Sequence, residues 1–184
     1  MISKKIQLED DDKESMSLMI EHRLPWLILG LIGGILATLL SARFEAILLK
    51  NIQLAFFIPI IVYLADAVGT QTESIYIENL TRRKVKFHVY LLKEFILGNI
   101  IGALFGFCTG LFAYFWFDSP EIAFTVGYAM FATMGIAPIT ALIVPTILWR
   151  RHHDPTIGTG PFVTVIQDLL SLLIYFYIAS VIIF

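Results

Sequence analysis

Charged residues are scarce in this sequence. Asp, Glu, Lys and Arg make up 15% of its 184 residues, whereas soluble domains carry about 25%. Hydrophobic residues account for 58%, and the mean hydropathy is +0.80. A chain with so little charge and so much apolar surface is predicted to be an integral membrane protein, with little sequence left for a separate soluble domain.

Cysteine occurs only once, at Cys108, which excludes an intrachain disulfide and a cysteine-based metal cluster. The first 23 residues are polar and include an acidic run at 9–12, so we expect a cytoplasmic tail and no cleavable signal peptide. The acidic run is interpreted as solvated, although it could attract cations to a pore mouth. No nucleophile–base pair or phosphate loop is recognisable, so we predict no enzyme and no nucleic-acid partner.

Residues 24–184 are predicted to form one all-α domain with five transmembrane helices, at about 25–40, 52–80, 95–117, 122–149 and 161–184. The second span is longer than a bilayer needs and is predicted to bend at Pro59 and Gly69. The fourth is predicted to be broken by Gly135, Pro138 and Pro145. Carbonyls freed by these prolines would line a cavity or be satisfied by neighbouring helices.

Basic residues predict the orientation. Four Lys and Arg lie in the N-terminal tail, five in the expected loop 82–94 and two in the expected loop 150–160. Only Arg43 and Lys50 lie between the first two spans. Because basic loops stay inside, the N-terminus is predicted to be cytoplasmic and the C-terminus outside.

The last span contains a single charged residue, Asp168, about 10 Å inward from Pro161 at 1.5 Å per residue. Thr164, Ser171 and Tyr175 are predicted on the same helical face. A carboxylate at this depth is by default functional and faces a cavity. The alternative is a neutral acid that ties two helices together.

Two further acids, Asp66 and Glu73, share a face of the second span because they are seven residues apart. Their oxygens, with those of Asp168 and Thr164, form a set that suits hard cations such as Mg²⁺. His152, His153 and Asp154 could bind a transition metal or form a solvated turn. Glycines repeat every four residues in the third span, which predicts close approach of another helix: Gly98, Gly102, Gly106 and Gly110.

Several short motifs resemble the membrane domain of the MgtE family of magnesium transporters. The opening carries Arg23-Leu24-Pro25-Trp26-Leu27, Phe44-Glu45-Ala46, Phe57-Ile58-Pro59 and Gly69-Thr70-Gln71. The ending carries Asp154-Pro155, Gly160-Pro161-Phe162-Val163-Thr164, Asp168 and Leu173-Ile174-Tyr175-Phe176. The likeness runs in order over about residues 23–180.

This resemblance implies a homodimer of five-helix subunits in the lipid bilayer, with a cation path between the subunits and Asp168 as the central ligand. It also implies cytosolic Mg²⁺-sensing domains; only 23 residues precede the first span, so we expect this gate to be missing or supplied by a separate regulatory chain. The family's second helix usually reads Gly-Asn-x-Gly-x-Gln. Here Asp66 and Ala67 replace its first two residues, so the added acid could alter selectivity or bind the ion.

Three hypotheses follow. The main one is a homodimeric channel or transporter for divalent cations, Mg²⁺ above all, with other divalent ions as possible substrates. The second is a cation–proton exchanger that uses Asp66 or Glu73 as the proton carrier. The third is a non-conducting membrane scaffold whose packing face is the glycine ladder.

Overall fold

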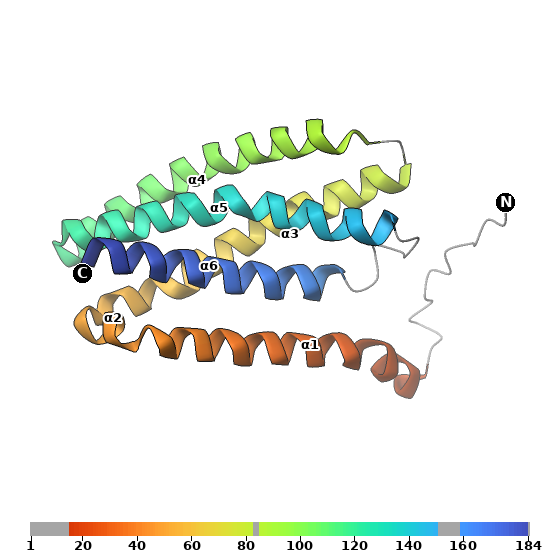
Figure 1. Cartoon of the computed structure of the whole chain (residues 1–184), viewed down its shortest axis with the longest axis horizontal. Coiled ribbons are helices and arrows are strands. Elements are labelled where there is room, and N and C mark those ends of the chain that lie inside the picture. Colours follow the sequence, from red (N-terminus) through yellow and green to blue (C-terminus); the bar gives the residue numbers. More distant parts are fainter. Residues whose placement is uncertain (1–14, 83–84, 151–158, 184) are drawn as a thin grey trace.

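The computed structural model describes residues 15–82, 85–150 and 159–183, and all the regular structure in these ranges is helical. Five of its segments are long and apolar enough to cross a bilayer. They are α1 (Met16–Arg43), η1 (Ile52–Phe57) with α3 (Ile58–Arg82), α4 (Phe87–Phe117), α5 (Pro120–Arg150) and α6 (Thr159–Ile183); the short α2 (Glu45–Lys50) follows α1. The predicted all-α architecture with five long apolar helices is confirmed (Figure 1).

Two helices begin earlier than the apolar pattern indicates. Helix α1 starts at Met16, where the Ser15 hydroxyl accepts a hydrogen bond from the Leu18 N–H at 3.4 Å. Helix α4 starts at Phe87, so Glu94, expected in a loop, lies inside a helix. The apolar pattern marks the stretch suited to the bilayer, whereas a helix continues beyond it as long as its backbone bonds and caps allow.

The break expected in the fourth span does not occur: helix α5 runs without interruption through Gly135, Pro138 and Pro145. Gly69, where a bend is predicted, lies within the continuous helix α3. Only Pro59 lies at a transition: it is the second residue of α3, directly after the 3₁₀ helix η1. Proline is well suited to a first helical turn, where its missing N–H has no intrahelical partner to lose.

The turn between α4 and α5 brings these helices side by side. Asp118 adopts a left-handed conformation with φ of 48°, and its N–H bonds to the Tyr114 carbonyl at 2.9 Å. Ser119 then accepts a bond from the Ile122 N–H at 3.4 Å, and Pro120 begins α5. This two-residue connection gives the antiparallel pair along the top of Figure 1.

The glycine ladder of α4 lies against α5 along its whole length. A Cβ added to Gly98, Gly102, Gly106 or Gly110 would lie 2.5–3.0 Å from a carbonyl oxygen of α5. The oxygens belong, in the same order, to Met134, Phe131, Gly127 and Ala123. The ladder is therefore occupied within this chain, so it is not a free face that could serve a scaffold.

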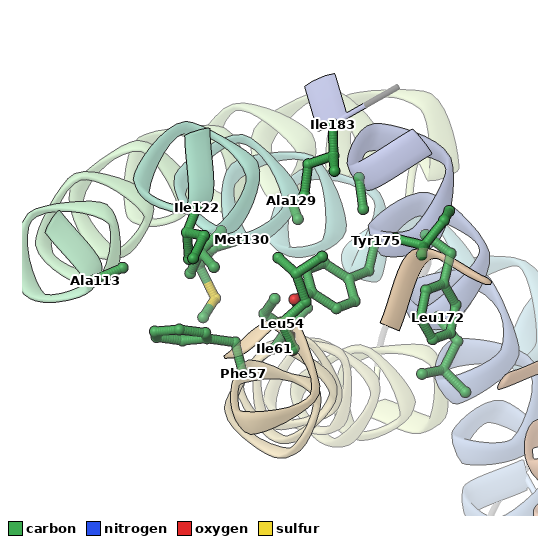
Figure 2. Close-up of a cluster of buried hydrophobic side chains, with 14 of the residues drawn as sticks. Leu54, Phe57, Ile61, Ala113, Ile122, Ala129, Met130, Leu172, Tyr175 and Ile183 are labelled. Atoms are coloured by element: carbon green, nitrogen blue, oxygen red, sulfur yellow. Dashed lines mark hydrogen bonds between the residues drawn. The ribbon is translucent and has the colours of Figure 1, made fainter. Parts of the chain in front are cut away.

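The buried core lies among η1, α3, α5 and α6, where Figure 2 shows Leu54, Ile61, Met130 and Tyr175 gathered together. The Tyr175 hydroxyl donates a hydrogen bond to the Leu54 carbonyl at 2.6 Å. This bond fixes η1 against α6, just before α3 begins.

Helix α1 lies at the edge of the bundle (Figure 1), and only its C-terminal part reaches the core, through Ala37 and Leu40. It contacts α6, where Gly33 lies directly against Val165 and the ring of Phe44, just past the helix, stacks on Phe176 at 4.7 Å. Most other side chains of α1 are exposed, as expected for a helix that faces lipid or another subunit.

Candidate functional site

Asp168 lies in an open groove of about 480 Å³ between α1 and α3. Helix α6 contributes Asp168 and Leu172, which lie one turn apart. The groove is lined on the α1 side by Ala37, Thr38 and Ser41, and on the α3 side by Ile58, Pro59, Val62 and Tyr63. Within the described ranges no side chain donates a hydrogen bond to the Asp168 carboxylate. Its oxygens are therefore available to a ligand that enters the groove.

The two acids of α3 face α6. The Thr164 side chain hydrogen-bonds to Asp66, and the Thr159 side chain hydrogen-bonds to Glu73. The later acid of α3 pairs with the earlier threonine of α6, because the two helices are antiparallel. Glu73 is only 6% exposed, whereas Asp66 is partly buried.

The three carboxylates form a row rather than a cluster. Asp66 is close enough to interact electrostatically with both Asp168 and Glu73. Among the residues that the structure describes, no group of three His, Cys, Asp or Glu side chains is compact enough to hold a metal ion. One chain therefore supplies carboxylates along a path, and a cation bound at Asp168 would need further oxygens from water or a second chain.

The polar face predicted for α6 is divided between two environments. Asp168 opens to the groove, whereas Ser171 and Tyr175 are fully buried. Ser171 lies within 3.4 Å of the Gln167 amide nitrogen, and Tyr175 bonds to η1 as described above. Ser171 and Tyr175 therefore lie in the interior, on the face of α6 adjacent to Asp168.

The remaining predicted residues have distinct surroundings. Gly69 is buried, and a Cβ added to it would meet the Ala137 carbonyl and the Gln167 amide oxygen at 3.8 Å, an ordinary contact distance. Gln71 is exposed. Pro138 packs against Gly98, and the Met134 carbonyl that this proline deprives of its usual donor contacts the same glycine, on the α4 side. The pattern His152-His153-Asp154 lies outside the described residues.

Three polar residues with buried contacts were not predicted: Gln167, Thr140 and Glu94. Gln167 is 1% exposed, and its Oε1 accepts a hydrogen bond from the Thr140 hydroxyl at 2.5 Å. The Glu94 carboxylate accepts a bond from Thr72 at 2.9 Å. The sequence does contain a signal for Gln167, an amide within an otherwise apolar span and four residues before a serine. Glu94 was assigned to a basic loop, which hid its helical position.

Comparison with known proteins identifies the family. Residues 58–178, from the start of α3 to near the end of α6, match the family model for MgtE, described as a divalent cation transporter. This chain belongs to the MgtE family. The match includes all three carboxylates of the row and the Thr140–Gln167 contact.

Curated relatives support the same assignment. The chain is 35% identical over 162 residues to the magnesium transporter MgtE of Bacillus subtilis and 32% identical over 161 residues to that of Enterococcus faecalis. It is 25% identical over 160 residues to the protein of the same name from Thermus thermophilus. These alignments cover 85–86% of this chain but only 35–36% of the relatives, so the chain spans about a third of their length. The MgtE family is a family of transporters, not of enzymes.

Proposed function

We propose that this protein carries divalent cations, Mg²⁺ foremost, across a membrane, and that Asp168 is the central ligand of the path. The main support is that Asp168 lies in an open groove, where no side chain among the described residues donates a hydrogen bond to its carboxylate. A charged carboxylate is costly inside a bilayer unless it faces water, a partner or an ion. A visiting divalent cation would relieve this cost, and the relatives that bear the name magnesium transporter support Mg²⁺ as the ion.

The chemistry of the row supports a hard cation. Carboxylate oxygens of Asp168, Asp66 and Glu73, with hydroxyls beside the last two, are the ligand type that Mg²⁺ and Ca²⁺ prefer. Mg²⁺ usually keeps several water molecules and takes one or two carboxylates. A single Asp168 with Asp66 nearby matches that sparse coordination better than a closed cage would. A transmembrane potential would drive the ion with about 2.3 kcal/mol per charge per 100 mV.

The groove also supports a homodimer with the path at the interface. Among the residues that the structure describes, one chain places a single carboxylate in the groove, and α1 leaves most of its surface uncovered. A two-fold partner would repeat the same residues across the axis, because a C₂ interface uses the same surface twice. Two Asp168 side chains facing one axis would double the charge available to the ion. The basic ends of the helices favour a cytoplasmic start of α1 and an outer end of α6.

The test is Mg²⁺ uptake into liposomes that contain the purified protein. Asp168→Asn keeps the size of the side chain and removes its charge, so uptake should fall to the level of empty liposomes. Asp118→Asn makes the same chemical change in the exposed α4–α5 turn, where asparagine tolerates the left-handed backbone, and should keep full uptake. Wild-type uptake by the Asp168 variant, with folding and oligomeric state unchanged, would refute the proposed ligand.

A second candidate is cation–proton exchange. The observation in its favour is the coupling of the nearly buried Glu73 to Asp66 along the α3–α6 contact, which provides neighbouring sites for a proton. An exchanger would export protons as Mg²⁺ enters, so the liposome interior would become more alkaline, and a pH gradient would change the rate of uptake. Uptake that is indifferent to pH gradients and accompanied by no proton movement would leave simple cation conduction.

A further inference from the structure

We propose that Gln167 is a positioning residue that sets the rotation of α6 and so turns Asp168 toward the groove. The inference rests on the proposed function, because the direction of Asp168 matters for transport only if the ion visits it.

The first support is the set of contacts around the Gln167 amide. Its oxygen accepts a bond from Thr140 of α5 at 2.5 Å, and its nitrogen lies 3.4 Å from the Ser171 hydroxyl. The backbone of α3 closes the third side at Gly69. The amide therefore lies where α3, α5 and α6 meet, shielded from both water and lipid. If α6 rotated so that the Gln167 amide moved away from Thr140, the amide oxygen would remain buried without a hydrogen-bond partner on another helix.

The second support is helical geometry. Successive residues of an α-helix point about 100° apart, so a fixed direction for residue 167 also fixes that of residue 168. Asp168 and Leu172 face the groove, and Gln167 and Ser171 form the adjacent face toward the interior. Thr164 and Tyr175, which bond to Asp66 and Leu54, lie one turn before and two turns after Asp168, and the rest of α6 around them is mainly Val, Leu and Ile. Packing of such side chains is much less directional than a hydrogen bond, and polar residues are known to join helices in membranes.

A residue that only stabilises the fold would behave differently from one that positions Asp168. Loss of a purely structural bond lowers the unfolding temperature and leaves the ion affinity of the folded protein unchanged. Loss of a positioning bond also changes the Mg²⁺ concentration that gives half-maximal uptake. Neighbours that orient metal ligands commonly change affinity or activity by about 10- to 100-fold when they are removed.

The matched variants are both on α5. Thr140→Val removes the hydroxyl that bonds to Gln167 on α6 and to the Ala137 carbonyl of its own helix. Thr133→Val removes a fully buried hydroxyl that bonds only within its own helix, to Ala129 at 2.8 Å and Met130 at 3.2 Å. In liposomes, Thr140→Val should raise the half-saturating Mg²⁺ concentration by about 10-fold, and Thr133→Val should leave it unchanged. Thr140→Ser restores a hydroxyl and should restore the wild-type value.

Two more variants, Gln167→Leu and Asp168→Asn, separate failure of this inference from failure of the proposed function. Gln167→Leu removes the amide altogether and should show the same rise, so it decides the matter if Thr140→Val does not fold. Equal half-saturating concentrations for folded Thr140→Val and Thr133→Val, or a wild-type value for Gln167→Leu, would overturn the inference. If Asp168→Asn abolishes uptake in the same assay, the proposed function survives that outcome. If Asp168→Asn transports normally, the proposed function itself fails.

Discussion

At the scale of single residues, the polar side chains of the spans form hydrogen bonds in two ways, either within their own helix or to another segment. Most hydroxyls donate to a carbonyl three or four residues earlier in their own helix; among them are Thr38, Ser41, Thr109, Thr125 and Thr133. Such bonds satisfy a hydroxyl in an apolar setting and link nothing else. A smaller group connects different segments, as Thr140 does to Gln167, Thr146 does to Tyr76 and Tyr175 does to Leu54. These connections specify how the helices are rotated and where η1 lies.

Tyr175→Phe should therefore lower stability without changing the shape of the core. The change removes one buried hydrogen bond to the Leu54 carbonyl, which contributes about 1 kcal/mol. Tyr177→Phe is the matched control, because Tyr177 lies on the same helix with 67% of its surface exposed. Thermal unfolding in detergent should show a lower midpoint for the Tyr175 variant than for the Tyr177 variant. Equal midpoints would mean that the bond to η1 adds nothing to stability.

At the scale of elements, the α4–α5 pair is the most tightly specified part of the fold. Small residues on both helices allow backbone to approach backbone: a Cβ on Gly127 would also lie 3.0 Å from the Gly106 carbonyl. Pro138 belongs to the same contact. Because proline has no N–H, the Met134 carbonyl lacks its usual donor within α5, and this carbonyl contacts α4 at Gly98. The two features that looked separate in sequence, the ladder and the proline, thus meet at one interface.

Gly106→Ala should loosen this pair. The added methyl would lie 2.5 Å from the Gly127 carbonyl, so the backbones must separate, and overpacking of this kind costs about 1–3 kcal/mol. Gly34→Ala serves as the control, since nothing lies within 4 Å of the position that its methyl would take. The Gly106 variant should unfold at a lower temperature than the Gly34 variant, which should match or exceed wild type because alanine favours helix. The reverse order would contradict the close contact.

The sequence predicted the elements better than their mutual orientation. Apolar length and the turn residues Asp118, Ser119 and Pro120 sufficed for five helices and the α4–α5 connection, since both signals are local. Helix starts and the continuity of α5 were missed, because neither depends on hydropathy alone. For the site, the spacing of Asp66 and Glu73 indicated a common face, and the structure places both toward α6. Gln167 was overlooked, because its importance depends on Thr140, which lies 27 residues away in sequence and on another helix.

At the scale of the whole molecule, the long helices run side by side, so their termini gather at two opposite ends of the bundle (Figure 1). The start of α1, the end of α3, the start of α4 and the end of α5 lie at one end, together with Arg82, Lys86 and Arg150. The α4–α5 turn and the end of α6 lie at the other. Because basic residues are retained in the cytoplasm, the first end should face the cytoplasm and the α4–α5 turn should face outward.

Cysteine labelling of intact cells tests this orientation. Glu121→Cys and Lys86→Cys each place an exposed thiol at one end of the bundle, Glu121 in the first turn of α5 and Lys86 just before α4. Each is made with Cys108→Ala, so that it carries the only thiol in the chain. A membrane-impermeant maleimide should label Glu121→Cys in intact cells and Lys86→Cys only after the cells are opened. The opposite pattern would invert the protein and, with it, the direction in which ions meet Asp168. Labelling of both thiols in intact cells would break the five-span arrangement itself, because one span separates them.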